Sequence, residues 1–164
     1  MTDAVAAKPA VSIKALREEL DEAAAAILAA AIGEGTVERA RTMVTASRQD
    51  ADCDLYGLTV DGELAAVYVL HKVTLMNEIT YLAVAERFRR QGHGRACLYD
   101  ALLRSGRRPL VVETDDDAVG FYKRCGFKLV GKRKHPSGAV RYRLGWHAPM
   151  PKVTVASDQN AGTC

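Results

Sequence analysis

The segment 81–95 restricts the fold of this chain more than any other part of its sequence. An apolar run over residues 81–85 leads into a basic turn that contains Gly92 and Gly94, and a helical pattern continues from there to Leu103. The first amides of a helix have no partners within the helix, and the helix dipole adds positive charge beside them. Glycines, which lack a Cβ atom, leave such amides open to an oxyanion. The segment therefore predicts a strand, a helix, and a phosphate or pyrophosphate site where the two meet.

Positive charge is concentrated around this turn, where Arg87, Arg89, Arg90 and Arg95 follow the strand. Over the whole chain, 23 Lys and Arg residues stand against 20 Asp and Glu residues, so the net charge is only +3. That balance does not by itself predict a protein that binds polyanions. A nucleic-acid-binding module would also need aromatic residues for base stacking, and aromatics make up only 6% of the chain. We therefore expect a local anion site and no nucleic-acid partner.

The rest of the chain alternates between helical and strand patterns. Helical spacing predicts a first helix that Ser12 caps, with an inward face over residues 16–31, and a second helix that starts at Thr36. Asp61 and Gly62 separate two apolar runs, 55–60 and 63–70, which is the strongest short signal for a β-hairpin. Further strands are expected over 78–85, 109–114, 128–134 and 140–146, and further helices over 92–103 and 118–125. This order predicts an α/β (α+β) fold in which helices flank a mixed β-sheet.

The composition suits one globular domain with short tails, since 48% of the 164 residues are hydrophobic. Residues 1–12 and 148–164 are mostly small or polar and contain prolines, so we expect two flexible ends around a domain that spans 13–147. The apolar stretch 23–32 is too short to cross a membrane, and it follows acidic residues where an export signal carries basic ones. We therefore expect a cytoplasmic protein with no membrane partner.

The four cysteines stand far apart in the sequence, at positions 53, 97, 125 and 164. They form no CxxC pair and show no spacing typical of a zinc site. We therefore expect reduced thiols and no bound metal.

The turn differs from two well-known phosphate loops. A Walker loop requires Lys and then Ser or Thr after its last glycine, whereas Arg95 and Ala96 follow Gly94. A dinucleotide fingerprint requires a third small residue where Cys97 stands, and it belongs in the first strand–helix unit of a domain.

Two motifs in register resemble those of the GNAT superfamily of N-acyltransferases. The first is Arg89-Arg90-Gln91-Gly92-His93-Gly94, which is similar to the acyl-CoA loop of that superfamily, Arg/Gln-x-x-Gly-x-Gly/Ala. The second is Ala118-Val119-Gly120-Phe121-Tyr122-Lys123-Arg124-Cys125-Gly126-Phe127, which is similar to its Ala-x-x-Phe-Tyr-x-x-x-Gly-Phe helix. The resemblance covers residues 13–146. It implies a centrally splayed sheet and the direct transfer of an acetyl group from acetyl-CoA to a primary amine.

The resemblance also implies where acetyl-CoA binds. The backbone of the central strand, at Leu82, Ala83 and Val84, would pair with the pantetheine arm like an added strand. The pyrophosphate would lie on the amides of the turn, with Arg89 near its edge. These amides are those of Arg90, Gln91, Gly92, His93, Gly94 and Arg95.

Two residues are candidates for proton transfer. Tyr122 matches the superfamily tyrosine near the sulfur of CoA, and it would protonate the departing thiolate; the alternative is a tyrosine that only packs in the core. Glu78 matches the base of the histone-acetylating branch, and it precedes Leu82 by four residues, so both side chains are expected on one face of the sheet. The alternative for Glu78 is a solvated carboxylate.

Four other carboxylates are rival candidates for the base: Glu113, Asp115, Asp116 and Asp117. Of these, Asp116 or Asp117 is expected to cap the helix at Ala118.

The sequence departs from the superfamily pattern in three places. Asp115 stands where many members have an asparagine, which puts its contact to the pantetheine arm in doubt. His93 replaces an aliphatic or aromatic residue, and we expect a surface imidazole there. Before the first predicted helix there is little room for the usual first strand, so we expect a sheet that is one strand short.

The sequence does not identify the acceptor amine. A small amine, an antibiotic, a protein N-terminus and a lysine side chain all stay open. The basic cluster at 132–135 favours a solvated hairpin tip over a site for an acidic acceptor. A catalytically silent domain that senses acyl-CoA is the alternative function. Association into a homodimer also stays open.

Overall fold

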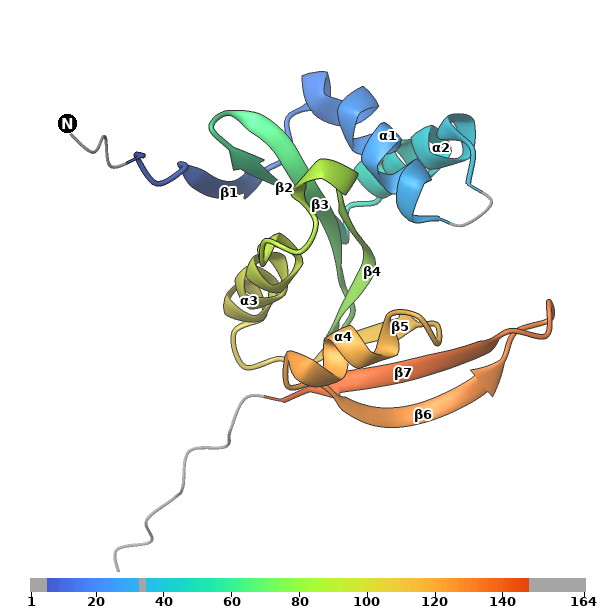
Figure 1. Ribbon diagram of the computed structural model, residues 1–164. Coiled ribbons are helices and arrows are strands. Elements are labelled where there is room, and N and C mark those ends of the chain that lie inside the picture. Colours follow the sequence, from blue (N-terminus) through green and yellow to red (C-terminus); the bar gives the residue numbers. More distant parts are fainter. Residues whose placement is uncertain (1–5, 33–34, 148–164) are drawn as a thin grey trace, which may run out of the picture.

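The computed structural model describes residues 6–32 and 35–147, which form a seven-stranded mixed sheet with helices on both faces (Figure 1). The strand order is β1-β2-β3-β4-β5-β7-β6, and β4–β5 is the parallel pair of this sheet. The strands are β1 (Val11–Ala15), β2 (Cys53–Val60), β3 (Glu63–Lys72), β4 (Asn77–Val84), β5 (Leu110–Thr114), β6 (Lys128–Lys134) and β7 (Val140–Trp146). The helices are α1 (Asp21–Ala31), α2 (Val37–Gln49), α3 (His93–Ser105) and α4 (Val119–Arg124), with two 3-10 turns, η1 (Glu18–Leu20) and η2 (Glu86–Phe88). The prediction of an α/β fold with a mixed sheet is confirmed.

Two apolar cores lie on the two faces of the sheet. On one face, α1 and α2 contribute Leu28 and Val44, which pack with Val67 and Val69 of β3. On the other face, α3 and α4 pack over a second core whose fully buried members include Leu98, Leu110 and Leu144. Figure 1 shows α1 and α2 together, separated by the sheet from α3. We refer to these as the α1/α2 face and the α3/α4 face.

The central strands of the sheet separate after a short parallel pairing. β4 pairs with β5 only where Asn77, Glu78 and Ile79 meet Leu110, Val111 and Val112. Beyond Ile79, β4 keeps β3 as its neighbour and leaves its other edge open. This is the splay that the resemblance implies.

The open edge of β4 exposes the backbone groups of alternate residues. The N–H of Ala85 donates to the carbonyl of Ala65 at 2.8 Å, so these two residues form a hydrogen-bonded pair of the ladder. Because antiparallel ladders alternate, Ala83 directs its N–H and C=O toward β3, whereas Leu82 and Val84 direct theirs to the open edge. Two of the three residues assigned to the pantetheine arm therefore present their backbone there.

Two expectations about the N-terminal part are wrong. Ser12 does not cap a helix, because it lies in β1, which pairs antiparallel with β2 from Val11↔Val60 to Ala15↔Tyr56. The sheet is therefore not one strand short, and α1 begins only at Asp21. The physical reason is pairing: the five residues of β1 find backbone partners along β2 that the sequence of β1 alone does not indicate.

The second helix and the hairpin are confirmed. Thr36 caps α2 and accepts a hydrogen bond from the N–H of Arg39 at 3.2 Å. Asp61 and Gly62 adopt φ values of 50° and 85°, as a two-residue turn between twisted strands requires. Of the segments 1–12 and 148–164, which we expected to be flexible, residues 1–5 and 148–164 lie outside the described residues, and Val11 and Ser12 belong to β1. Within the described ranges, none of the helices combines the length and the apolar character that a membrane crossing requires.

Candidate acetyl-CoA site

Six consecutive amides form the centre of the site at the start of α3. The N–H groups of residues 90–95 donate no hydrogen bond to any atom of the described residues, whereas Arg89 and Ala96 on either side both donate one. Gly92 is the N-cap of α3 and has a φ of 84°, and no side chain caps the helix. Arg90 also has a positive φ, of 60°, which turns the chain toward the helix. This arrangement provides an open set of donors with the positive end of the α3 dipole behind them.

The two glycines of the loop serve different purposes. A Cβ atom on Gly94 would lie 3.3 Å from Cζ of Phe121 and 3.5 Å from Cγ2 of Val84, so Gly94 allows α3 to approach both β4 and α4. A Cβ atom on Gly92 would meet nothing within 4 Å, but the positive φ there favours glycine. Gly92 therefore allows the backbone conformation of the loop, and Gly94 allows the start of α3 to pack closely against β4 and α4.

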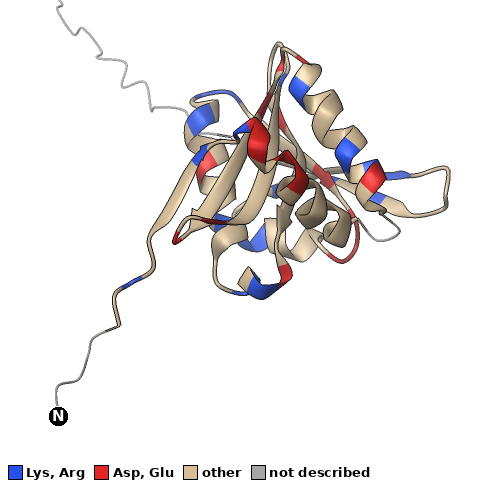
Figure 2. Ribbon diagram, turned by 90° about the horizontal axis from the view of Figure 1, so that it is seen from above, with Lys and Arg blue, Asp and Glu red and all other residues tan. Residues whose placement is uncertain are grey.

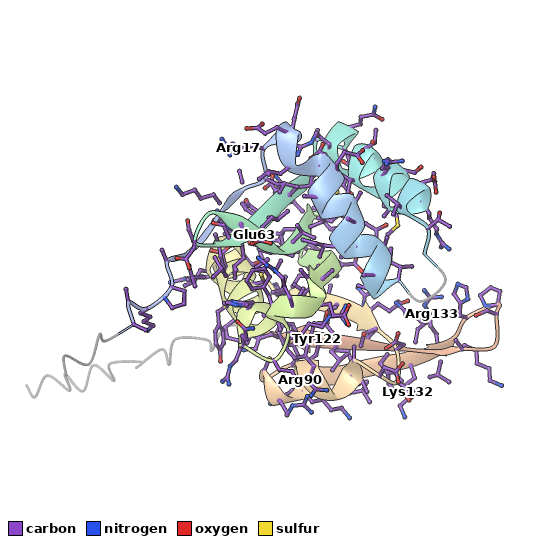
Figure 3. All side chains as sticks on the ribbon, turned by 45° about the horizontal axis from the view of Figure 1, so that its top comes forward. Arg17, Glu63, Arg90, Tyr122, Lys132 and Arg133 are labelled. Atoms are coloured by element: carbon purple, nitrogen blue, oxygen red, sulfur yellow. The ribbon has the colours of Figure 1, made fainter. Side chains whose placement is uncertain are left out.

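The arginines around the loop are not equivalent. Arg87 is paired with Glu63, and Arg95 donates to the hydroxyl of Tyr99 at 2.8–3.0 Å. Arg89 donates from Nε to the carbonyl of Val84 at 3.1 Å, which places it where the open edge of β4 meets the amide loop. Arg90 is exposed and forms no ion pair with a described residue (labelled in Figure 3). Of these arginines, Arg87 alone is paired with a described carboxylate, so Arg89, Arg90 and Arg95 keep an uncompensated positive charge beside the loop.

His93 is buried, with 9% of the residue exposed, so the expectation of a surface imidazole is wrong. Its ring meets Phe88 edge-on, with ring centroids 6.0 Å apart. Nε2 has no hydrogen-bond partner within the described part of the chain. The burial follows from the η2 turn, because this turn brings Phe88 beside the first residue of α3.

Tyr122 lies on α4 in the α3/α4 core, between the rings of Phe121 and Phe127, which it meets edge-on at 5.1 Å and 5.8 Å. It is 7% exposed, and its hydroxyl forms no hydrogen bond with a described residue. Burial raises the pKa of Tyr122, and Cys125 and Asp115 raise it further. The phenol therefore keeps its proton at neutral pH and can act as a donor.

Glu78 is half-buried in β4 and forms no ion pair or hydrogen bond with the described residues. Its neighbour Ile79 packs in the α3/α4 core, so alternation directs Glu78 to the α1/α2 face. Leu82 packs in the α3/α4 core as well, and the expectation that Glu78 and Leu82 share a face is therefore wrong. The reason is a bulge at Thr80, where the register to β3 skips one residue and the alternation reverses. Glu78 and Tyr122 thus lie on opposite faces at the splay.

Three of the four rival carboxylates have structural partners, and the carboxylate of Asp117 has none among the described residues. Oδ1 of Asp115 accepts hydrogen bonds from the N–H groups of Asp117 and Ala118, both at 3.1 Å, so Asp115 caps the turn, and the expected cap at Asp116 or Asp117 is wrong. Asp116 accepts a hydrogen bond from the hydroxyl of Tyr142. Glu113 is paired with Arg133 and Arg141, and the hydrogen bond from Arg133 is the main cause of its lowered pKa. A carboxylate with a lowered pKa is a weaker base, so Glu113 is a poor candidate for the base.

Arg143 has no local motif in the sequence, and the structure places it two strands away from Glu78. It lies on β7, opposite Glu113 of β5, and Nη2 contacts Sδ of Met76 at 3.5 Å. Met76 precedes β4 and stands two residues before Glu78. Arg143 is half-buried and forms no ion pair with a described carboxylate.

The open strand edge beside a helix start with free amides defines a class of protein that binds acyl-CoA at the splay of a mixed sheet. The chain belongs to the acetyltransferase (GNAT) family, whose model matches residues 17–127. It is therefore an N-acetyltransferase that uses acetyl-CoA. No curated protein matches its sequence.

Solved structures with different acceptors share the fold. The ribosomal-protein-S18-alanine N-acetyltransferase from Escherichia coli is 23% identical, with a TM-score of 0.71 over 89% of this chain and 99% of that one. An aminoglycoside 6′-N-acetyltransferase complexed with coenzyme A is 14% identical, with a TM-score of 0.73 over 85% of this chain and 99% of that one. A mutant of the spermidine N-acetyltransferase from Vibrio cholerae is 13% identical, with a TM-score of 0.69 over 84% and 93%.

Proposed function

We propose that acetyl-CoA binds across the junction of β4 and α3, and that its acetyl group passes at the splay to a primary amine on the α1/α2 face. The pyrophosphate accepts hydrogen bonds from the amides of residues 90–95, and the pantetheine arm pairs with the open edge at Leu82 and Val84. The observation that carries this proposal is the run of six amides without partners next to an open strand edge. The same proposal places the reaction in the cytoplasm, where the free thiols Cys53, Cys97 and Cys125 stay reduced.

The amine must lose a proton before it can attack the thioester. An amine with a pKa of about 10.4 is only about 0.1% neutral near pH 7.4, which is a deficit of roughly 4 kcal/mol. Glu78 accepts this proton, directly or through a water molecule, on the α1/α2 face. Tyr122 donates its proton to the departing thiolate from the α3/α4 face. The base and the acid therefore act from opposite faces of the sheet.

Replacement of Glu78 by glutamine should lower kcat by about 100-fold, because a positioned base contributes about 10²- to 10⁴-fold. The dissociation constant of acetyl-CoA should change less than about twofold, because Glu78 is not part of the amide loop. Steady-state kinetics and calorimetry measure the two quantities.

Glu113→Gln is the matched control for Glu78→Gln, because it removes the same charge from the neighbouring strand, where Arg133 and Arg141 already pair with the carboxylate. An equal loss of kcat in both variants would show a general effect of charge and would contradict the role of Glu78.

A thiol-release screen with acetyl-CoA against a panel of amines, peptides and proteins tests the activity and identifies the acceptor class. We expect at least one amine to release CoA at a rate that depends on the enzyme. Tight binding of acetyl-CoA with no turnover across the panel would instead favour a silent sensor of acyl-CoA.

The guanidinium of Arg143 forms no ion pair with a described residue and contacts Met76, two residues before Glu78, and it predicts an acceptor that carries a carboxylate near its amine. An ion-paired hydrogen bond contributes roughly 1.5–3 kcal/mol, so an acceptor with a carboxylate should exceed its carboxamide analogue in kcat/KM by about tenfold or more. Arg143→Gln should remove this preference. A polyamine such as spermidine should be a poor acceptor, and equal rates for carboxylate and carboxamide in the wild-type enzyme would contradict the role of Arg143.

A further inference from the structure

Three side chains of different chemistry converge at one end of the sheet, away from the amide loop. Asp50 ends α2, Cys53 begins β2, and His71 lies near the end of β3, directly opposite Cys53 in the ladder. A carboxylate oxygen, the sulfur and a ring nitrogen from these residues all lie within 4.8 Å of one another. We call this group the 50/53/71 cluster.

The spacing between two of the three ligand atoms fits a tetrahedral metal ion. Sγ of Cys53 lies 3.6 Å from Oδ2 of Asp50. A zinc ion bound at about 2.3 Å from sulfur and about 2.1 Å from oxygen, with a tetrahedral angle between them, separates the two ligands by about 3.6 Å. The sulfur and the oxygen therefore already stand at the separation that a shared zinc ion requires.

The charge around the cluster also favours a cation. Asp50 and Asp52 lie beside Cys53 in the sequence, whereas the neighbouring Asp54 is already paired with Lys72 at 3.1 Å. When a divalent cation binds, its charge offsets one thiolate and one carboxylate, and the thiol proton passes to solvent.

The carboxylate of Asp50 is held in place by the turn that follows α2. Its Oδ1 accepts the N–H of Asp52 at 2.9 Å, while Oδ2 points to the thiol of Cys53. Such a partner orients a metal-binding carboxylate and limits the reorganisation that binding requires.

We propose that Asp50, Cys53 and His71 form a binding site for a transition-metal ion of the zinc type, with water as the fourth ligand. Thiolate and imidazole ligands select Zn²⁺ or Co²⁺ over Mg²⁺ and Ca²⁺. The metal joins the end of α2 to β2 and β3. It lies one strand away from Glu78, which faces His71 across the β3–β4 pair. This proposal departs from the expectation of no metal, because the pairing of β2 with β3 brings His71 to Cys53, 18 positions earlier in the chain.

Titration of the reduced, metal-free protein with Co²⁺ tests the proposal without reference to catalysis. Thiolate coordination produces a sulfur-to-cobalt charge-transfer band in the near ultraviolet, and a tetrahedral site gives intense visible absorption. We expect both signals at one equivalent of Co²⁺, and we expect Zn²⁺ to displace them.

Three variants remove one ligand each, and a fourth serves as the control. Cys53→Ser should abolish the charge-transfer band, and His71→Ala and Asp50→Asn should each weaken Co²⁺ binding by at least about tenfold. Asp50→Asn can still accept the N–H of Asp52, so it preserves the turn, and circular dichroism checks the fold of every variant. Cys125→Ser removes a thiol on α4 and should leave the band unchanged. A wild-type protein without the band, or a band that survives in Cys53→Ser or keeps its full affinity in His71→Ala, would overturn the proposal.

Discussion

Replacement of Gly92 by aspartate should weaken the binding of acetyl-CoA by about 100-fold, while replacement by asparagine should weaken it by less than about tenfold. The two side chains have the same shape, and both residues tolerate a positive φ better than other non-glycine residues. A Cβ at position 92 meets nothing within 4 Å, so neither variant creates a clash. The difference between the variants, more than about tenfold or about 1.4 kcal/mol, therefore isolates the repulsion between a carboxylate and the diphosphate.

Isothermal titration calorimetry with acetyl-CoA measures both dissociation constants, and thermal unfolding shows whether the two variants are equally stable. Gly94 is less suitable for this test, because a side chain there would also press on Phe121 and Val84. Equal affinities for the aspartate and asparagine variants would mean that the diphosphate does not lie on this loop.

Replacement of Tyr122 by phenylalanine should lower kcat by about 100-fold and leave the affinity for acetyl-CoA within about twofold of the wild type. A positioned acid contributes about 10²- to 10⁴-fold, and removal of the hydroxyl leaves the edge-on contacts with Phe121 and Phe127 in place. The hydroxyl forms no hydrogen bond with a described residue, so its loss should not lower the stability of the fold.

Steady-state kinetics at saturating acetyl-CoA measure this effect, and Tyr142→Phe is the control. Tyr142 donates to Asp116 on the β7 side and lies outside the proposed acid position. An unchanged kcat in Tyr122→Phe would contradict the role of Tyr122 as the acid and would mean that this residue only packs in the α3/α4 core.

The acyl-CoA loop could be predicted from the sequence because its determinants are local. The strand, the two glycines and the first turn of α3 occupy one continuous segment, and the free amides follow from the position of the helix start. The same holds for the Thr36 cap and for the turn at Asp61 and Gly62. In each case neighbouring residues determine the backbone conformation.

Features that depend on pairing between distant strands could not be predicted in this way. β1 exists because residues 11–15 pair with β2, and the face of Glu78 depends on a bulge at Thr80 that is defined only against β3. His93 is buried because the η2 turn brings Phe88 beside it. The 50/53/71 cluster requires the β2–β3 register. None of these contacts has a signature within its own segment.

The charge distribution agrees with a local anion site. Figure 2 shows that Lys and Arg positions (blue) and Asp and Glu positions (red) are interspersed along the ribbon of the described residues. Lys132 and Arg133 belong to the β6–β7 arm (Figure 3), where Arg133 pairs with Glu113 and Lys132 lies over the ring of Tyr142. Two residues of the cluster at 132–135 thus contact other side chains of the protein.

A crystal structure of the protein with coenzyme A tests the central claim most directly. We expect the diphosphate oxygens within about 2.7–3.2 Å of amide nitrogens in the segment 90–95, and the pantetheine arm beside the backbone of Leu82 and Val84. Coenzyme A bound at another surface, with those amides still without partners, would contradict the account.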